Sequence, residues 1–582
     1  MSESADRTSP ELPSFCKSLF GGVLDVETIF PFPRPSPADA EALEAYLEDL
    51  RRFLDAKVDG DAFDREGAIP EGVLEGLSER GVFGLYVPRA YDGLGFSQVD
   101  AAEVLAEIAG RDGGLAVVVG SHLSIGIRGI LLYGTEAQKR RWLPQCARGD
   151  TLAAFALTEP GHGSDAAHIE SRAEHDGGAW RLDGHKIWIG NADRAGVITV
   201  FAQTPVQHDG GTVDRVTAFV LEGHQDGIEI GRTWSVEKLG VRSSTQAELF
   251  FRDVVVPDDQ VLDRPGEGFA VAMNVLNGGR LGAAAFAVGG LRRMRVEAVA
   301  FASGRRQFGR PIAEFDLIRE KLARIEVDTY VAEAMVRLTA RLVDRGDVDY
   351  SLESAICKVF VSEAAWRAAD DAVQIAGGRG YMNDRPFERF LRDTRVLPIF
   401  EGTNEILRVF IALGGMEKLA EYLEGVGRAL RDPLRELGVV TEFAFHRIAD
   451  TIGSPEAGVE VAEPLHGCLE ELERFTRILH GGAERLIRTY RDEVVERQLH
   501  LARLADMAID LYGVAAAIAR AQAEIEAEGE AAAAADVDIV RRFCFAARRR
   551  LEVNRALLEE NDDERIRAIA ERTLVRYRGA LA

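Results

Sequence analysis

Apolar residues at helical spacing dominate the first quarter of the chain, beginning with a helix that starts near residue 36. Ser36 is suited to cap this helix, Pro37 to its first turn, and Asp39 to the positive end of its dipole. Apolar side chains then recur at intervals of three and four residues, at Leu43, Tyr46, Leu47, Leu50, Phe53 and Leu54. Comparable patterns, broken by Gly and Pro, continue to about residue 150. They predict a leader over residues 1–40 and an N-terminal helical domain over 41–152.

From residue 153 to 265 the helical pattern gives way to short segments rich in β-branched and aromatic residues. VITVFAQT (197–204), RVTAFVLEG (215–223) and AELFFRDVVVP (247–257) are typical of strands bounded by turns. AWRLDGHKIWI (179–189) alternates around Asp183-Gly184, which indicates a hairpin turn at that dipeptide. We therefore expect a compact antiparallel β domain here.

Long helical patterns return after residue 266 and continue to the end. Segments such as DLIREKLARIEVDTYVAEAMVRLTARLV (316–343) predict a helical bundle over 266–428. The Ala-rich remainder predicts a helical C-terminal extension over 429–582, with an apolar face at Val440, Phe443, Ile448 and Ile452 and basic residues at Arg541, Arg542 and 548–550. The fold class is thus α+β and multidomain: helical, then β, then helical, with an extra helical domain.

Composition narrows the class of protein. A chain of 582 residues is too long for one hydrophobic core, and a net charge of −25 argues against nucleic-acid binding. The five cysteines are scattered singly and no His or Cys pair has metal-ligand spacing, so we expect a reducing compartment and no metal. The N-terminus lacks a secretory pattern and the apolar stretches look too short to span a membrane, which predicts a cytoplasmic protein.

Three segments carry candidate chemistry, and each has an ordinary structural alternative. LTEPGHGSD (157–165) is a Gly-containing loop suited to phosphates or ring edges, but also to a surface turn. In KIWIGN (186–191), Trp188 is suited to stacking on a flat heterocycle or to filling a core. In IFEGTNEI (399–406), Glu401 lies among apolar residues, where burial raises a carboxylate's basicity and suits a general base; the alternative is an acid at a helix N-terminus.

Taken in order, the motifs resemble those of the acyl-CoA dehydrogenase family. They are LTEPGHGSD, WIGN (188–191), RRQFG (305–309), QIAGGRGY (374–381) and EGTNEI (401–406), and the match runs over essentially the whole length. The leader, the stretch GSHLSIGIRGILLYGTEAQK (120–139) and the extension resemble the very-long-chain branch. The resemblance implies FAD, an acyl-CoA substrate, Glu401 as the base that removes the α-proton, and its backbone N–H as a donor to the thioester oxygen.

The resemblance also assigns roles to individual positions. The expected cofactor-binding residues are Phe155, Leu157, Thr158, Ser164, Trp188, Ile189, Gly190, Arg305, Gln307, Phe308, Gln374, Ile375, Gly377, Gly378, Thr403 and Glu405. The expected substrate-binding residues are Ser164, Asn277, Arg280, Glu401 and Gly402. Of these, Arg305, Gln307 and Phe308 match positions that reach FAD held mainly by a neighbouring subunit.

Two positions distinguish this chain from some relatives. Some members carry the base one residue before the arginine of LNGGR, where this chain has Gly279, so Glu401 is left as the candidate. After Trp-Ile the family usually has Thr or Ser with a hydroxyl that reaches the flavin, whereas this chain has Gly190. We therefore expect the flavin to be tuned there by backbone or water. His162 occupies a loop position that is more often small in the family; we expect it to be an exposed bystander, and the alternative is that it approaches the phosphates or CoA.

The predicted function is FAD-dependent α,β-dehydrogenation of long-chain fatty acyl-CoA to trans-2-enoyl-CoA, with electrons passed to electron-transfer flavoprotein. Small residues in GLAVVVGS (114–121) favour a deep pocket for a long acyl chain. The alternatives are an acyl-CoA oxidase that uses oxygen and an assembly factor of a respiratory complex. By resemblance, the extension implies a homodimer with, at most, peripheral membrane contact at the inner face of the membrane.

Overall fold

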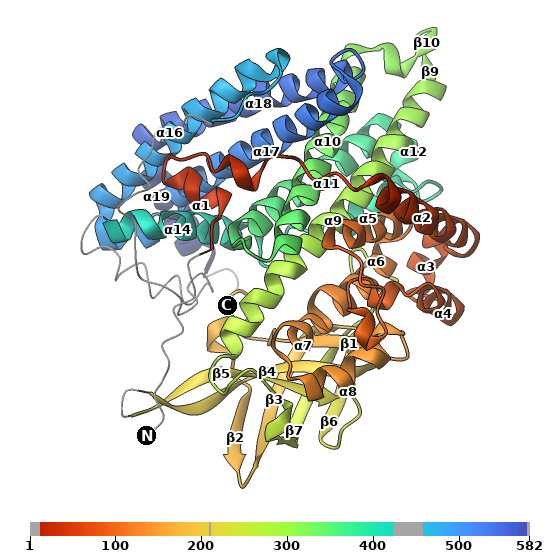
Figure 1. Cartoon of the computed structure of the whole chain (residues 1–582), viewed down its shortest axis with the longest axis vertical. Coiled ribbons are helices and arrows are strands. Elements are labelled where there is room, and N and C mark those ends of the chain that lie inside the picture. Colours follow the sequence, from red (N-terminus) through yellow and green to blue (C-terminus); the bar gives the residue numbers. More distant parts are fainter. Residues whose placement is uncertain (1–11, 209–210, 423–457, 579–582) are drawn as a thin grey trace.

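The computed structural model describes residues 12–208, 211–422 and 458–578, with a sheet at one end of the molecule and long helices at the other (Figure 1). The predicted cap is confirmed: the Ser36 side chain accepts from the N–H of Asp39 at the start of α2, with Pro37 in the first turn. Leu47, Leu50 and Leu54 form the buried stripe of this helix. The helices before the sheet are α2 (Pro37–Lys57), α3 (Gly60–Glu66), α4 (Glu71–Glu79), α5 (Gln98–Ala109), α6 (Gly113–Gly120), a π-helical turn (Ser121–Gly126), α7 (Arg128–Tyr133) and α8 (Glu136–Ala147).

The first eight described strands form one sheet in the order β6-β7-β3-β2-β4-β5-β8, with β1 also paired to β4. They are β1 (Leu152–Ala156), β2 (Arg172–Asp176), β3 (Ala179–Gly190), β4 (Ala195–His208), β5 (Gly211–Glu222), β6 (Ile228–Trp234), β7 (Gln246–Pro257) and β8 (Val261–Leu262). Most pairs are antiparallel, as expected, but β1 and β2 each pair with β4 in parallel. Strand β5 is buried without interruption from Val216 to Leu221, because α9 packs on the sheet at this strand.

The predicted hairpin at Asp183-Gly184 is wrong, because both residues lie inside the continuous strand β3. The turn between β2 and β3 is instead Gly177-Gly178, where φ values of 63° and 101° suit glycine. Gly184 is explained by a different feature. The register of β3 with β7 shifts at this residue, and a Cβ here would lie 2.1 Å from the Ser171 hydroxyl oxygen. A close approach of two segments, which the sequence pattern does not show, therefore explains this glycine.

Long helices follow the sheet and position the site. They are α9 (Gly268–Gly304), α10 (Asp316–Arg345), α11 (Ser351–Ala376) and α14 (Asn404–Tyr422), with the short α12 (Gly378–Tyr381) and α13 (Phe387–Thr394) and a hairpin of β9 (Arg306–Gln307) and β10 (Arg310–Pro311). Helix α9 runs from the sheet to the far end of the helical region, where β9 and β10 lie (Figure 1). It packs against α11, α10 and α5.

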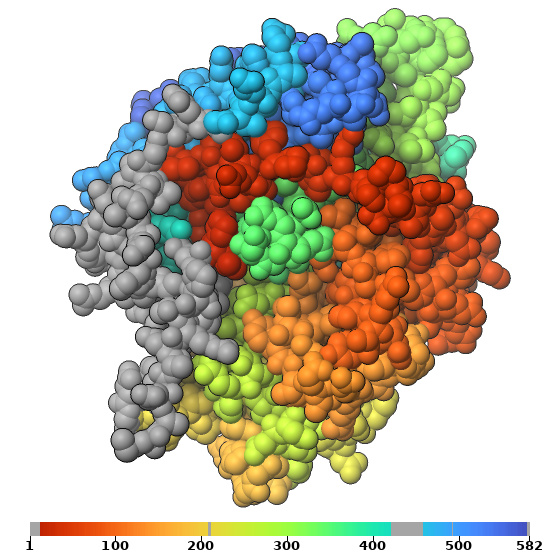
Figure 2. Space-filling model, viewed as in Figure 1, coloured from red at the N-terminus to blue at the C-terminus, as the bar shows by residue number. Residues whose placement is uncertain are grey.

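The extension is a second helical layer that packs directly on α10, α11 and α14 and also contacts the leader. It contains α16 (His466–Tyr490), α17 (Gln498–Glu528), α18 (Ala534–Glu559) and α19 (Asp563–Arg578). Leader helix α1 (Phe15–Phe20) is anchored on buried Glu353, which accepts from the Ser14 hydroxyl (2.8 Å) and the N–H of Cys16 (2.9 Å). His480 of α16 bonds the Phe20 carbonyl at 2.8 Å. The leader therefore lies along the boundary between the two layers (Figure 2).

Two expectations concern segments that could contact or span a membrane. The stretch Gly113–Tyr133 is helical over 21 residues and apolar enough to span a bilayer by length and composition, so the expectation that apolar stretches are too short is wrong. This stretch is nevertheless largely buried inside the protein, as the core helix of a globular domain would be. The predicted apolar face at Val440, Phe443, Ile448 and Ile452 lies outside the described residues.

Candidate active site

Glu401 lies in the chain reversal that leads from α13 into α14. Its φ is 58° and that of Gly402 is 86°, so two successive residues adopt the left-handed conformation. Thr403 then caps the following helix, because its hydroxyl oxygen accepts from the N–H of Ile406 (3.3 Å). A left-handed conformation is unfavourable for glutamate, and such backbone strain concentrates at functional sites.

The Glu401 carboxylate is packed against the middle of α9. A Cβ added to Gly279 would lie 2.3 Å from Glu401 Oε2 and 2.8 Å from a side-chain carbon of Ile125. Glycine at position 279 is therefore required by the carboxylate that rests on it. Oε2 is buried without a hydrogen-bond partner among the described residues. Burial raises the pKa of Glu401 to about 7, although the positive charges of Arg280 and Lys358 oppose this rise.

Asn277 and Arg280 stand on the same turn of α9, and both are buried. Arg280 donates to Asn277 Oδ1 (2.8 Å), and its guanidinium carbon lies 4.8 Å from the centre of the Phe410 ring. Burial lowers the pKa of Arg280 to about 10, while the Glu401 charge acts in the opposite direction. The structure thus places these two predicted substrate residues beside the predicted base.

A second group of predicted residues lies where β1 and β3 meet the LTEPGHGSD loop. Phe155 and Leu157 are buried, Thr158 accepts the N–H of Ile187 (3.0 Å) through its carbonyl, and Ser164 is exposed. Trp188 has a φ of 57° and a side chain that is 60% exposed. An indole exposed to this extent does not fill a core, so the core-filling alternative is wrong, whereas stacking on a flat heterocycle stays a prediction.

Gly190 has an unexpected neighbour. A Cβ at this position would lie 3.2 Å from the hydroxyl oxygen of Ser121, in the π-helical turn that also carries Ile125. No hydrogen bond joins the Ser121 hydroxyl to another described residue. A hydroxyl is therefore present beside Gly190, although it comes from another segment of the chain.

The predicted cofactor residues in RRQFG and QIAGGRGY are not brought to Glu401 within one chain. Arg305, Gln307 and Phe308 are exposed at the far end of α9, and the side chain of Phe308 is 93% exposed. The helix between Arg280 and Arg305 spans about 37 Å at 1.5 Å per residue. Near this end lies α12, which begins at Gly378 (Figure 1). Gln374 and Ile375 end α11, and Gly377 joins the two helices. A Cβ at either glycine would have no atom within 4 Å, so the backbone is open to a ligand there. Glu405 is also exposed.

Sequence reasoning missed three charged residues that hold the site. Lys186 is fully buried and donates to Glu159 (2.6 Å) and to the Leu157 carbonyl (3.1 Å), which clamps the LTEPGHGSD loop onto β3. Lys358 of α11 donates to the Gly402 carbonyl (2.7 Å) and to Asn404 Oδ1 (2.8 Å). For Lys358, the signal available in the sequence was a single lysine inside an apolar helical segment, ICKVF (356–360).

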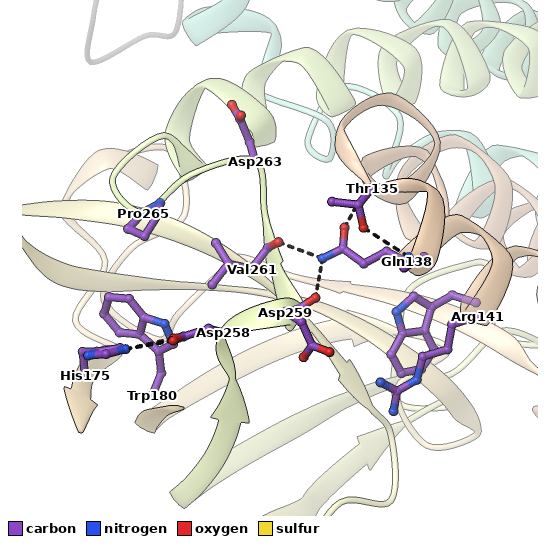
Figure 3. A pocket seen from close by; sticks show the side chains of 12 residues that line it. Thr135, Gln138, Arg141, His175, Trp180, Asp258, Asp259, Val261, Asp263 and Pro265 are labelled. Carbon is purple, nitrogen blue, oxygen red and sulfur yellow. Dashed lines mark hydrogen bonds and ion pairs between the residues drawn. The ribbon is translucent and has the colours of Figure 1, made fainter. Parts of the chain in front are cut away.

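A large surface cavity, of about 570 Å³, lies elsewhere. It opens between α8 and the sheet and is lined by Gln138, Arg141, Trp180 and the carboxylates of Asp258, Asp259 and Asp263 (Figure 3). His175 pairs with Asp258 at its edge (2.9 Å). None of the predicted site residues lines this cavity, so we place the candidate active site at Glu401 on geometry and chemistry.

Comparison with known proteins agrees with this geometry. Residues 40–150, 154–254 and 266–416 match the N-terminal, middle and C-terminal domains of acyl-CoA dehydrogenase, and residues 464–577 match the ACAD9/ACADV C-terminal domain. The chain is 38% identical over 580 residues to the very-long-chain specific acyl-CoA dehydrogenase of Rattus norvegicus, covering 97% of this chain and 87% of the relative. It is 33% identical over 545 residues to the probable acyl-CoA dehydrogenase FadE10 of Mycobacterium tuberculosis, covering 89% and 82%.

The solved structure of an acyl-CoA dehydrogenase from Bacillus anthracis, complexed with FAD, superposes with a TM-score of 0.79 at 28% identity and covers 95% of this chain and 93% of its own. The matched models cover all three domains around Glu401 as well as the extension. This chain belongs to the acyl-CoA dehydrogenase family of oxidoreductases.

Proposed function

We propose that this protein catalyses FAD-dependent α,β-dehydrogenation of long-chain fatty acyl-CoA, with Glu401 as the base. The observation that carries the proposal is the buried Glu401 carboxylate, whose Oε2 has no partner in the described structure and whose pKa burial raises to about 7. A base of that strength is close to optimal for proton abstraction near neutral pH.

The chain's own groups account for proton removal. Glu401 Oε2 accepts the α-proton, and Gly279 leaves it the space to approach the substrate. The N–H of Glu401 makes no hydrogen bond to another described residue, so it can donate to the thioester oxygen on which negative charge develops. Arg280 favours the carboxylate form of Glu401, and Asn277 orients its guanidinium. FAD, when bound, supplies the acceptor for the hydride from the β-carbon.

Several features fit FAD. Trp188 presents an indole next to the LTEPGHGSD loop, and the open backbone at Gly377 and Gly378 suits the approach of a pyrophosphate. The Bacillus anthracis neighbour, described as complexed with FAD, supports the same cofactor. Because Arg305 and Phe308 lie about 37 Å of helix away from Arg280, they would contact FAD bound mainly by a second subunit, and we include a homodimer in the proposal.

The long-chain preference and the partners are finer parts of the proposal. The name of the Rattus norvegicus relative supports long acyl chains, and Gly120 contributes no side chain next to Ser121, where a Cβ would have nothing within 4 Å. Electron-transfer flavoprotein is the proposed acceptor. Helix α19 exposes Ile566, Ile569, Leu574 and Val575 beside several arginines, which supports peripheral contact of a cytoplasmic protein with a membrane.

The test is anaerobic titration of the purified protein with palmitoyl-CoA, with Glu401→Gln as the matched variant. Bleaching of the flavin band in the wild type but not in the variant is the expected result. Bleaching only by a shorter or branched thioester would keep the reaction and refute the chain length. If the bleached protein is then exposed to air, rapid reoxidation with oxygen consumption and no other acceptor would favour an oxidase. A protein that takes up no FAD would refute the proposal.

A further inference from the structure

Lys358 is a fully buried cation that no assigned role explains. It lies in the middle of α11, and its ammonium donates to the Gly402 carbonyl (2.7 Å) and to Asn404 Oδ1 (2.8 Å). Both acceptors belong to the residues that directly follow Glu401. Burial removes the hydration of the lysine ammonium, and these two hydrogen bonds compensate for that loss.

The acceptors are themselves held in place. Asn404 donates to the Ser362 hydroxyl (3.0 Å) and to Glu363 (3.1 Å), and Arg408 donates to Glu363 (2.8 Å). The reversal at Glu401 and Gly402, with two positive φ values, is thus tied to α11 through one ammonium and one amide. A left-handed conformation is unfavourable for glutamate, so it persists only where neighbouring contacts hold it.

The charged groups that act on Glu401 come from two helices. Arg280 faces it from α9 and Lys358 from α11, and both favour its carboxylate form. The charges of Glu401, Glu363 and Glu405 act on Lys358 as well, whereas Arg280 repels it. Burial lowers the pKa of Lys358 to about 7, and the negative charge of Glu401 opposes this lowering.

We infer that Lys358 is a positioning residue for the base: its ammonium holds the Glu401–Gly402 reversal and favours the carboxylate form of Glu401. This inference rests on the proposed role of Glu401. It assigns Lys358 no contact with substrate or flavin, and it predicts that removing the cation moves the pH dependence of the reaction as well as its rate.

The test is the pH dependence of kcat/KM for palmitoyl-CoA, which reports the ionisation of the free enzyme. Lys358→Gln keeps an N–H donor without the charge, and Lys358→Met removes both. Ser362→Ala is the matched control, because it alters the same network on α11 but keeps the cation. Glu401→Gln is measured in parallel, and flavin content and thermal unfolding establish that each variant is folded.

In both Lys358 variants we expect the acidic limb of the kcat/KM–pH profile to move upward by about one pH unit. This shift corresponds to about a tenfold loss of kcat/KM at pH 6. In Ser362→Ala the acidic limb should stay at the wild-type position. An acidic limb at the wild-type position in a flavin-containing Lys358→Gln overturns the inference. If neither variant retains flavin, Lys358→Arg decides: a wild-type limb supports the inference, and a limb displaced by a unit overturns it. If Glu401→Gln retains activity, Glu401 is not the base, and both the proposed function and this inference are refuted. If Glu401→Gln is inactive but the acidic limb of Lys358→Gln stays at the wild-type position, only the role of Lys358 is refuted.

Discussion

Gly279→Ala tests whether the Glu401 carboxylate works from the position seen in the structure. The added methyl carbon would lie 2.3 Å from Oε2, whereas carbon–oxygen contacts of this kind begin at about 3.3 Å. The carboxylate must therefore move by about 1 Å. A displacement of that size from the reacting atoms costs about a hundredfold in rate, or about 2.7 kcal/mol.

The expected loss should not come from unfolding. Alanine is favoured over glycine inside a helix by about 1 kcal/mol, so α9 itself gains from the change. Gly290→Ala is a matched control on the same helix, because its methyl carbon would meet only a side-chain carbon of Thr394, at 3.9 Å. Both variants should bind FAD and unfold close to the wild-type temperature.

The assay is the single-turnover rate of flavin bleaching by palmitoyl-CoA without oxygen. We expect Gly279→Ala to be slower by about a hundredfold and Gly290→Ala to match the wild type. If Gly279→Ala, with full flavin content, reacts within about threefold of the wild type, the carboxylate is not used from this position and the reasoning fails.

Three further predictions concern polar groups away from the Glu401 carboxylate. Burial raises the pKa of Glu353 to about 7, above its unfolded value near 4.3, so its destabilising charge develops as pH rises from about 4.3 to 7. Glu353→Gln should therefore be more stable than the wild type above pH 7, by up to about 3 kcal/mol, and equal to it below pH 4; equal melting temperatures at pH 8 would contradict this. Lys186→Met should lower the free energy of unfolding by about 3 kcal/mol and weaken FAD retention, because Glu159 is left buried without its ion-pair partner. The double variant Lys186→Met/Glu159→Gln should recover much of this loss. Ser121→Ala should shift the flavin midpoint potential by about 20 mV and Gly190→Ser in that background should reverse it; an unchanged potential would mean that Ser121 does not reach the flavin.

Much of the fold followed from local pattern. The cap and apolar stripe of α2 were predictable, because helix ends and faces depend on residues within one or two turns. The hairpin at Asp183-Gly184 failed for the converse reason: two dipeptides of turn-forming residues lie close together, and the choice between Gly177-Gly178 and Asp183-Gly184 depends on how β3 pairs with β7. The apolar stretches were expected to be too short to span a membrane, but residues 113–133 form a helical segment of sufficient length, and its burial inside the protein depends on tertiary packing.

The sequence by itself determined the order of the domains, the family and the identity of the candidate base, because motifs such as EGTNEI are contiguous and their chemistry belongs to the residues themselves. Only the tertiary structure decided what surrounds that base. Gly279 and Lys358 approach Glu401 from positions more than 40 residues away, and Ser121 reaches Gly190 from another domain. Contacts of this kind depend on how α9, α11 and the sheet pack, and packing leaves no periodic trace in a single sequence.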